Sequence, residues 1–278
     1  MIKIMIKVVC IIVLIIVVLY FILIMPRLLN RPDYKPFYGY YYAHRGFHDM
    51  ASQQKCPENS YAAIKKAVEC GYGIEFDVHL TKDSIPVVFH DDNLKRMCGV
   101  DANLRDYTYA ELQRFRLLDT DERIPAFSDV LKLVDGRVPL IIEYKVEKGN
   151  ADKLCSICND MLLKYNGLYC IESFHPMAVH WYRKNRPDIV RGQLSEDFTR
   201  EKMNLPYFLL SHLIGNCYAM PDFVSYNCKH RKELSRTLCR NLYRCLSVAW
   251  TVRSQEELET IAPYFDLYIF EGFMPLNS

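Results

Sequence analysis

Hydrophobic residues are distributed unevenly along the chain, and their longest continuous stretch lies at the N-terminus. Every residue from 1 to 25 is apolar except Lys3 and Lys7, and an unbroken apolar run extends from Val8 to Met25. A helix of about 18 residues is about 27 Å long, which is close to the hydrocarbon thickness of a bilayer. The pattern therefore predicts one transmembrane helix, with residues 1–30 forming an N-terminal membrane anchor and its flanks.

A cleavable signal peptide is the alternative interpretation of this run. Signal peptides usually have about 7–15 apolar residues followed by a small-residue cleavage site. The run here is longer and continues as Met25-Pro26-Arg27 without an Ala-x-Ala pattern, which favours an uncleaved single-pass anchor. Basic residues flank both of its ends, so the positive-inside rule does not orient the chain in the membrane. These residues are Lys3, Lys7, Arg27, Arg31 and Lys35.

The rest of the chain alternates short apolar runs with amphipathic segments. Nine runs have the length and the β-branched or aromatic content of strands. Helical patterns fill most of the gaps, and Asn59 or Ser60 is placed to cap the helix expected at 57–70. Alternating strands and helices over about 240 residues predict an α/β fold, most economically a (β/α)8 TIM-type barrel. The nine runs are 34–42, 74–80, 86–89, 138–144, 168–174, 189–194, 223–226, 246–251 and 267–270.

The second and third runs are too close together to be neighbouring parallel strands. About five residues join 74–80 to 86–89, whereas a parallel crossover needs a dozen or more. We therefore expect this pair to form a hairpin or an irregular strand, with one of the nine runs outside the barrel. No linker rich in proline, glycine or serine interrupts the body, so residues 38–278 are expected to form one domain.

Composition excludes several classes of protein. The chain has 278 residues, half of them hydrophobic, and its 35 basic and 33 acidic side chains give a formal net charge of +2. These values exclude a disordered, collagen-like or coiled-coil chain, and the lack of a second long apolar run excludes a multi-span transporter. The near-neutral body has no basic patch with interleaved aromatic residues, so nucleic acid is not an expected partner.

Eleven cysteines are scattered along the chain, and one of them, Cys10, lies inside the apolar run. Cys155 and Cys158 form a C-x-x-C motif, but no second pair follows at zinc-binding spacing, so we expect unreactive thiols. A large unpaired set of thiols is typical of a reducing compartment. It favours a cytoplasmic position for the body but leaves the side of the membrane open.

Chemistry-bearing side chains gather at the carboxyl ends of the predicted strands. In a (β/α)8 barrel these ends converge on one mouth, where active sites lie. Glu75 and Asp77 are two residues apart and so face the same side of their strand, as do Glu143 and Lys145. The candidates in chain order are His44, Arg45, Glu75, Asp77, His90, Glu143, Lys145 and Trp250.

This set of side chains suits cleavage of a phosphodiester. Three carboxylates in one concave site repel one another unless a cation binds, and hard oxygen ligands suit Ca²⁺ or Mg²⁺. Two histidines suit a general acid and a general base, and Arg45 and Lys145 suit an anionic oxygen. Each residue alone also has an ordinary explanation: Lys145 as a salt-bridge partner of Glu143, for example, or Trp250 as barrel core. We interpret the other histidines considered, at 48, 79, 175 and 180, as incidental.

Taken in order, these residues resemble those of the glycerophosphodiester phosphodiesterase family. The resemblance spans about residues 40–252 and is specific because so many short motifs occur together. It implies a (β/α)8 barrel and metal-dependent hydrolysis of a glycerophosphodiester to glycerol 3-phosphate and an alcohol. The matching stretches are AHRG (43–46), PENS (57–60), IEFDVHLTKDSIPVVFHD (74–91), IIEYK (141–145), ESF (172–174) and AWTV (249–252).

The resemblance also implies a role for each candidate. In the mechanism proposed for such enzymes, the 2-hydroxyl of the substrate's glycerol attacks phosphorus, and water then opens the cyclic phosphate. The two histidines act twice, in reversed roles. By motif, the acid–base pair is His44 and His90, the metal ligands are Glu75, Asp77 and Glu143, and the substrate-binding residues are Arg45, Lys145 and Trp250.

Two departures from the family pattern leave alternatives open. Ser60 replaces the usual threonine of PENT, and Glu271 stands where many members have an aspartate after the last strand. The segment 196–245 has no recognisable motif and could shape the pocket for the alcohol. A lysophospholipase D reaction on lysophospholipids is therefore the alternative activity, and a non-catalytic, membrane-tethered phosphodiester-binding barrel is a third, less favoured interpretation.

Overall fold

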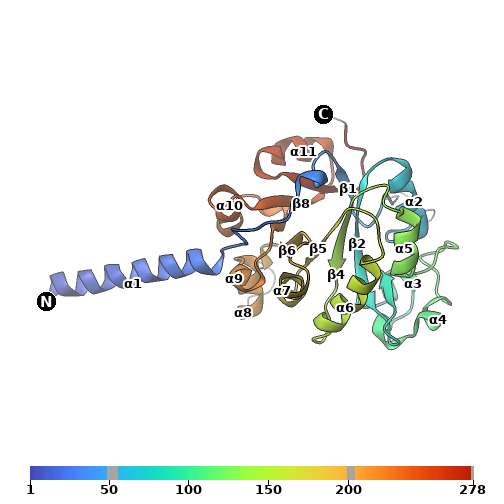
Figure 1. Ribbon diagram of the computed structural model, residues 1–278, viewed down its shortest axis with the longest axis horizontal. Helices are drawn as coiled ribbons and strands as arrows, with labels where there is room; N and C mark the ends of the chain where they lie inside the picture. The colour runs from blue at the N-terminus through green and yellow to red at the C-terminus, as the bar shows by residue number, and fades with distance from the viewer. Residues whose placement is uncertain (49–55, 199–203, 277–278) are drawn as a thin grey trace.

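The body of the protein is a closed barrel of eight parallel strands, seen in a computed structural model that describes residues 1–48, 56–198 and 204–276 (Figure 1). Their order is β1-β9-β8-β7-β6-β5-β4-β2, and pairing of β2 with β1 closes the sheet. The predicted (β/α)8 barrel is thus confirmed. The strands are β1 (Tyr41–Ala43), β2 (Gly73–Leu80), β4 (Leu140–Tyr144), β5 (Tyr169–Ser173), β6 (Arg191–Ser195), β7 (Phe223–Asn227), β8 (Leu246–Val252) and β9 (Leu267–Phe270).

Helices cover the outside of the barrel (Figure 1). The apolar faces of α2, α5, α6 and α7 pack with outward-facing strand residues in one large hydrophobic cluster. Ser60 caps α2, since its hydroxyl accepts a hydrogen bond from the amide of Ala63 at 3.1 Å. The helices are α2 (Tyr61–Glu69), α3 (Lys95–Cys98), α4 (Tyr109–Leu112), α5 (Phe127–Val134), α6 (Ala151–Leu162), α7 (Pro176–Asn185), α8 (Leu205–Ser211), α9 (Asn216–Ala219), α10 (Leu234–Asn241) and α11 (Gln255–Ile261).

The third predicted strand lies outside the barrel, as its short connection requires. This strand, β3 (Pro86–Val88), pairs antiparallel with the end of β2, where Val78 is opposite Val88. The hairpin leads into the segment 89–124, which contains the 3-10 helix η2 (Leu104–Asp106) and has a small hydrophobic cluster of its own. The predicted hairpin is therefore confirmed.

The first predicted strand is wrong over most of its length. Only β1 is extended, and Lys35–Phe37 forms the 3-10 helix η1 instead. Pro36 has no amide hydrogen to donate to a sheet, which explains why the aromatic stretch does not continue as a strand. Phe37 is buried beneath the barrel, where its carbonyl accepts a hydrogen bond from the Tyr42 hydroxyl at 2.9 Å.

The barrel interior is apolar at one end and polar at the other. Tyr42, Phe223 and Ile269 belong to an apolar cluster distinct from the one under the helices. Gly192 makes room for this cluster, since a Cβ at this position would lie 2.1 Å from the Phe223 ring. Polar side chains therefore occupy the other end of the interior, at the carboxyl ends of the strands.

The N-terminal helix α1 (Ile2–Leu23) projects from the body (Figure 1). It is the one helix among the described residues that is long and apolar enough to cross a membrane, and none of it is buried within the body. By length and composition it fits a membrane anchor and a signal sequence alike. The described cysteines, including Cys155 and Cys158 in α6, form no disulfide.

Candidate active site

Three buried carboxylates meet inside the polar end of the barrel. Asp77 on β2 lies directly opposite Glu143 on β4, and Glu75 is two residues before Asp77 on the same strand. One oxygen from each of the three lies within 4.8 Å of the others. The sequence prediction that these side chains converge is therefore confirmed, whereas their role as ligands is not tested by this geometry alone.

Neighbouring groups compensate part of this negative charge. The Lys145 ammonium is 2.9 Å from Asp77 Oδ1 and 2.6 Å from Glu143 Oε1. The Asn59 side-chain amide donates to Asp77 Oδ2 at 2.8 Å, and the Arg45 backbone amide donates to Glu75 Oε2 at 3.0 Å. The PEN motif thus reaches the mouth, with Ser60 serving as the helix cap and Asn59 as a partner of the carboxylates.

The carboxylates differ in how strongly they hold their protons. Burial, reinforced by the charges of Asp77 and Glu143, raises the pKa of Glu75 well above its usual range. Burial also opposes ionisation of Asp77, but Lys145 and Arg45 outweigh it and hold the pKa of that carboxyl well below its usual range. The pKa of Glu143 is raised by burial and by Asp77, against the lowering effect of Lys145.

A divalent cation fits this donor set. The three side chains offer only oxygen atoms, which suits a hard cation such as Mg²⁺ or Ca²⁺. A fourth carboxylate, Glu172 on β5, lies opposite Glu143, and its Oε2 is buried without a hydrogen-bond partner. Burial, followed by the charge of Glu143, raises the pKa of Glu172 to about 8. The end of the barrel thus carries more carboxylate than Lys145 and Arg45 balance, as expected of a metal-binding site.

His44 is held by a carboxylate from the last strand. Its Nδ1 is 2.8 Å from Glu271 Oε2, which leaves Nε2 on the side of Glu75, 4.0 Å from Oε2. Burial lowers the pKa of His44 to about 4, although the hydrogen bond to Glu271 opposes this effect. Burial also opposes the ionisation of Glu271, but its contacts with His44 lower its pKa to about 2. The ionised carboxylate therefore accepts a hydrogen bond from Nδ1 of His44.

His90 is held in the same way from a different loop. Its Nδ1 is 2.6 Å from Asp91 Oδ1, so Nε2 is the nitrogen left available at the mouth. Arg96 Nε bonds the other oxygen of Asp91 at 2.7 Å, which fixes that carboxylate in turn. Each histidine therefore has one nitrogen oriented by a carboxylate and the other free, the arrangement that a general acid or base requires.

Two guanidinium groups face the mouth. Glu58 Oε1 lies 2.8 Å from Arg45 Nη1 and 2.6 Å from Arg96 Nη2, so one carboxylate positions both. Arg45 Nε is also 3.7 Å from Asp77 Oδ2. Arg45 and Arg96 line a cavity of about 1120 Å³ together with His90, Lys145 and other residues. This cavity carries the positive charge that an anionic oxygen of a phosphate needs.

Trp250 lies on the wall of this cavity. Its ring meets that of Phe174 edge to face, with centroids 5.7 Å apart. The sequence left the choice between barrel core and cavity wall open for Trp250. Its ring also packs against the apolar cluster inside the barrel, so it belongs to both.

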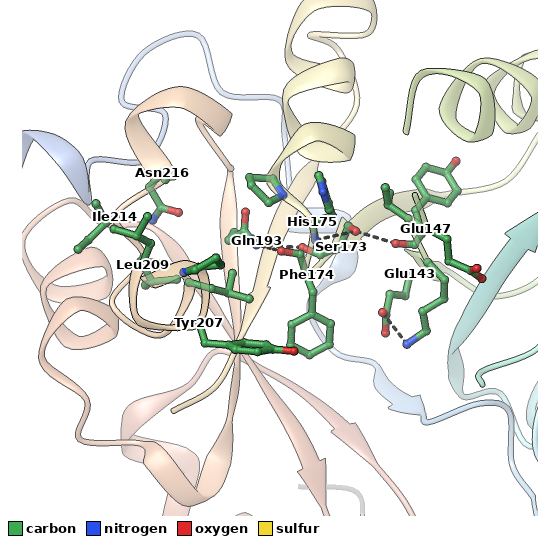
Figure 2. Close-up of a pocket in the computed structure, with 18 of the residues that line it drawn as sticks. Glu143, Glu147, Ser173, Phe174, His175, Gln193, Tyr207, Leu209, Ile214 and Asn216 are labelled. Atoms are coloured by element: carbon green, nitrogen blue, oxygen red, sulfur yellow. Dashed lines mark hydrogen bonds and ion pairs between the residues drawn. The ribbon is translucent and has the colours of Figure 1, made fainter. Parts of the chain in front are cut away.

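A second cavity of about 650 Å³ adjoins the first, and Figure 2 shows residues that line it. Lys145, Phe174 and Tyr207 line both cavities, so the two adjoin each other at these side chains. Figure 2 shows Glu143 at one end of the second cavity and the apolar side chains of Leu209 and Ile214 at the other. The segment 196–245 supplies this apolar end, mainly through α8.

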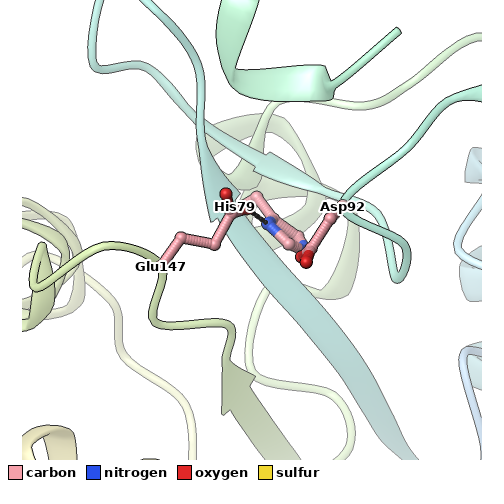
Figure 3. A group of neighbouring side chains, drawn as sticks. All are labelled: His79, Asp92 and Glu147. Atoms are coloured by element: carbon pink, nitrogen blue, oxygen red, sulfur yellow. Dashed lines mark hydrogen bonds and ion pairs between the residues drawn. The ribbon is translucent and has the colours of Figure 1, made fainter.

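A second group of potential ligand side chains adjoins the site (Figure 3). His79, Asp92 and Glu147 each place one ligand atom within 4.8 Å of the others. His79 Nδ1 lies 2.8 Å from Glu147 Oε1, and Nε2 lies 3.1 Å from the carbonyl of His90. Both ring nitrogens are thus already engaged by oxygen atoms of the protein. The group ties the ends of β2 and β4 to the loop that carries His90.

Several residues of the mouth were missed by the sequence prediction. They are Glu58, which bonds both Arg45 and Arg96, together with Arg96 itself, Glu172 and Glu271. Three of them had a weak signal, because Glu172 and Glu271 lie at the ends of predicted strands and Glu58 belongs to the PEN motif, whereas no motif contains Arg96. His48 and His79, read as incidental, also lie close to the site, with His48 Nε2 3.8 Å from Glu271 Oε1.

Comparison with known proteins identifies relatives of this chain. A family model described as the glycerophosphoryl diester phosphodiesterase family matches residues 44–264. YhdW from Bacillus subtilis (strain 168) is 30% identical over 234 residues, which cover 78% of this chain and 87% of YhdW. The human protein named lysophospholipase D GDPD1 is 35% identical over 122 residues, but these cover only 39% of this chain and 38% of the human protein.

A solved structure shares the same barrel. The Oleispira antarctica phosphodiesterase described in complex with the product sn-glycerol-3-phosphate superposes with a TM-score of 0.68 and 22% sequence identity. The superposition covers 85% of this chain and 94% of that structure. At this level of identity the likeness concerns the fold, and it agrees with the eight-stranded barrel described above.

Proposed function

Because this chain belongs to the glycerophosphoryl diester phosphodiesterase family, we propose that its barrel mouth hydrolyses glycerophosphodiesters to glycerol 3-phosphate and an alcohol. The enzyme class, a phosphoric diester hydrolase, follows from the family. The observation that carries the proposal is the pair of histidines, each held by a carboxylate, beside the group formed by Glu75, Asp77 and Glu143. All eight residues assigned from the sequence lie within the part of the chain that the family model matches.

Glu75, Asp77 and Glu143 are the residues that would hold a divalent cation, Mg²⁺ or Ca²⁺. When bound, such an ion would polarise the phosphoryl oxygens and offset charge that develops on them. Lys145 and Arg45 supply further positive charge at the same place, and Arg45 presents a planar group suited to two oxygens of a phosphate. Trp250 would contact the substrate from the wall of the larger cavity.

The two histidines are assigned as the acid–base pair. Glu271 keeps the proton of His44 on Nδ1, so Nε2 is free to accept a proton from the attacking 2-hydroxyl of the glycerol. Asp91 orients His90 in the same way, and Nε2 of His90 can protonate the departing alcohol. When water opens the cyclic phosphate, the same two atoms exchange these roles.

Lysophospholipids are a second candidate substrate class, and one observation favours them. The second cavity extends the mouth with an apolar arm lined by Leu209, Leu213 and Ile214, which suits an acyl chain better than a choline or ethanolamine head group. A lysophospholipase D reaction cleaves the same phosphodiester with the same groups. The name of the human relative points to that chemistry for the relative.

The remaining assignments concern the place of the enzyme in the cell. We assign residues 1–30 as a single-pass membrane anchor with its flanks and residues 38–278 as one catalytic domain. The length of α1 and its lack of burial within the body support the anchor. A cytoplasmic position of the domain is supported by the unpaired cysteines.

An assay on the full chain in detergent tests the proposal. Glycerophosphocholine and glycerophosphoethanolamine are offered as substrates, with glycerol 3-phosphate measured before and after EDTA. We expect turnover that EDTA abolishes, that Mg²⁺ or Ca²⁺ restores, and that His44→Ala removes. His212→Ala is the matched control, since His212 contacts Glu233 and lines neither cavity. Equal activity in His44→Ala and His212→Ala would overturn the assignment of His44.

A further inference from the structure

The end of the N-terminal helix is built into the body of the protein. The helix α1 ends at Leu23, and the next residue, Ile24, is already fully buried. The Ile24 carbonyl accepts hydrogen bonds from the Asn216 side-chain amide at 3.2 Å and from the Cys239 thiol at 3.4 Å. These partners belong to α9 and α10, so both helices lie directly at the end of α1.

Further hydrogen bonds fix the chain on both sides of this point. The Tyr243 hydroxyl donates to the carbonyl of Phe21 at 2.8 Å, within the last turn of α1. Beyond the helix, the backbone amide of Arg27 donates to the carbonyl of Pro221 at 3.0 Å. The Arg27 guanidinium donates to the carbonyl of Pro187 at 2.8 Å. No free linker separates α1 from the barrel, so the direction of α1 fixes which face of the body lies next to it.

That face carries several exposed apolar side chains. The helices α8, α9 and α10 form the side of the body nearest to α1 (Figure 1). Leu205 on α8 is 67% exposed, and on α10 Leu234 is 61% exposed. We call the following set the apolar collar: Leu28, Leu29, Leu205, Phe208, Leu209, Tyr218, Leu234 and Leu242.

Basic side chains accompany the collar. The segment 229–244 contains six lysine and arginine residues, of which Arg236 is buried, against one acidic residue, Glu233. Lys229, Lys232 and Arg244 among them are exposed. Apolar side chains interspersed with lysine and arginine are the composition of surfaces that lie in the interface of a bilayer with anionic lipids.

We propose that the apolar collar rests on the lipid bilayer that holds α1, at the boundary between head groups and acyl chains. The proposal rests on the proposed role of α1 as a membrane anchor. Since the body begins one residue after the span, the bilayer surface lies beside Asn216 and Cys239, and the collar residues on the neighbouring helices reach it. A bilayer covers these apolar side chains without requiring any further protein.

This placement has a consequence for the substrate. Leu205 and Leu209 of the collar also line the apolar arm of the second cavity, which continues to Lys145 and Glu143 at the mouth. The arm thus begins at the bilayer surface and ends at the catalytic groups. A single-chain phospholipid can enter it from the membrane, with its acyl chain in the arm and its phosphodiester at the mouth.

Fluorescence quenching tests the contact with the membrane directly. The full chain is placed in nanodiscs of phosphatidylcholine and phosphatidylglycerol that contain a lipid with a nitroxide on its head group. A coumarin amino acid is introduced at residue 208 by stop-codon suppression, which leaves the cysteines unlabelled. The matched control carries it at residue 163, where Leu163 is 63% exposed at the end of α6.

We expect the nitroxide to quench the probe at 208 and not the probe at 163. Equal quenching at both positions, or none at 208, would overturn the docking. This measurement needs no turnover, so its failure is distinguishable from failure of the proposed enzymatic function.

Kinetics of collar variants supply a second test. The variants Phe208→Glu, Leu234→Glu and the control Leu163→Glu are compared in vesicles of the same lipids, on membrane-borne lysophosphatidylcholine and on water-soluble glycerophosphocholine. Phe208 and Leu234 line neither cavity. We expect Phe208→Glu to lower turnover of the lipid about fivefold, because Phe208 is 41% exposed and its contact with lipid is lost.

Turnover of glycerophosphocholine should not change in either collar variant, and Leu163→Glu should alter neither rate. Leu234→Glu keeps the test available if Phe208→Glu fails to fold. Unchanged lipid turnover in both folded variants would contradict the proposal, as would an equal loss on both substrates.

Discussion

The carboxylate of Glu271 provides the sharpest test of how the mouth is organised. The substitution Glu271→Gln removes its charge with little change of shape. In the native protein, burial opposes the ionisation of Glu271, but its contact with His44 at 2.8 Å, followed by the charges of Arg253 and His48, lowers the pKa from 4.5 to about 2. Because the folded pKa lies below the unfolded value, the interaction stabilises the protein above about pH 4.5 and is lost as the pH falls toward 2.

The magnitude can be worked out in two ways. A pKa of about 2 in place of 4.5 corresponds to about 3 kcal/mol of unfolding free energy at neutral pH. A hydrogen bond to a charged group contributes about 1.5–3 kcal/mol. Both routes predict that Glu271→Gln lowers the unfolding free energy by about 2–3 kcal/mol at pH 7. Since partners that orient a catalytic or ligating histidine typically matter by about 10–100-fold, kcat should fall by a similar factor.

Urea unfolding in detergent, without added metal, measures this effect. Trp181 and Trp250 are the two tryptophans of the chain and both lie in the body, so their fluorescence reports the barrel and not α1. The control is Glu259→Gln, an exposed carboxylate that accepts a hydrogen bond from the Gln255 side chain at 3.1 Å. An unchanged stability in Glu271→Gln at pH 7, or a loss of equal size at pH 3, would refute the reasoning.

Three further predictions concern other residues of the barrel. Glu172→Gln should make the metal-free protein more stable than the native protein at high pH. Burial raises the pKa of Glu172 in the folded state to about 8, so the stability that its protonated form contributes is full below the unfolded pKa of 4.5 and is lost as the pH rises through 8. Urea unfolding between pH 6 and pH 9 follows this loss in the native protein and its absence in the variant. Lys145→Met should lower kcat by about 100-fold yet tighten Mn²⁺ binding, measured by calorimetry, because the ammonium neutralises Asp77 and Glu143; weaker Mn²⁺ binding would contradict this. Gly192→Ala should lower the unfolding free energy by about 1–3 kcal/mol through its clash with Phe223, and a stability equal to that of the native protein would exclude this packing.

Much of the barrel was predictable because its signals are local. Short apolar runs separated by amphipathic helices determine a parallel sheet, and the brief connection after Leu80 identified the hairpin. The error at residues 34–40 has an equally local cause, since Pro36 interrupts a stretch whose aromatic content otherwise favours a strand.

The candidate site was predictable only in part. Glu75 and Asp77, like Glu143 and Lys145, are two apart on single strands, so their shared direction can be read from the chain. His44 and Glu271 are 227 positions apart in the sequence. They meet because closure of the barrel places β9 beside β1. Likewise, nothing local indicates that Glu58 bonds Arg96 or that α8 lines a cavity.

The most direct test of the account is a crystal structure of the protein soaked with Mn²⁺, in which anomalous scattering locates the ion. The account predicts one strong peak among Glu75, Asp77 and Glu143, with Lys145 displaced from its present position between Asp77 and Glu143. A peak at His79, Asp92 and Glu147 instead, with Lys145 still paired to Asp77, would contradict the proposed metal site and the catalytic assignment built on it.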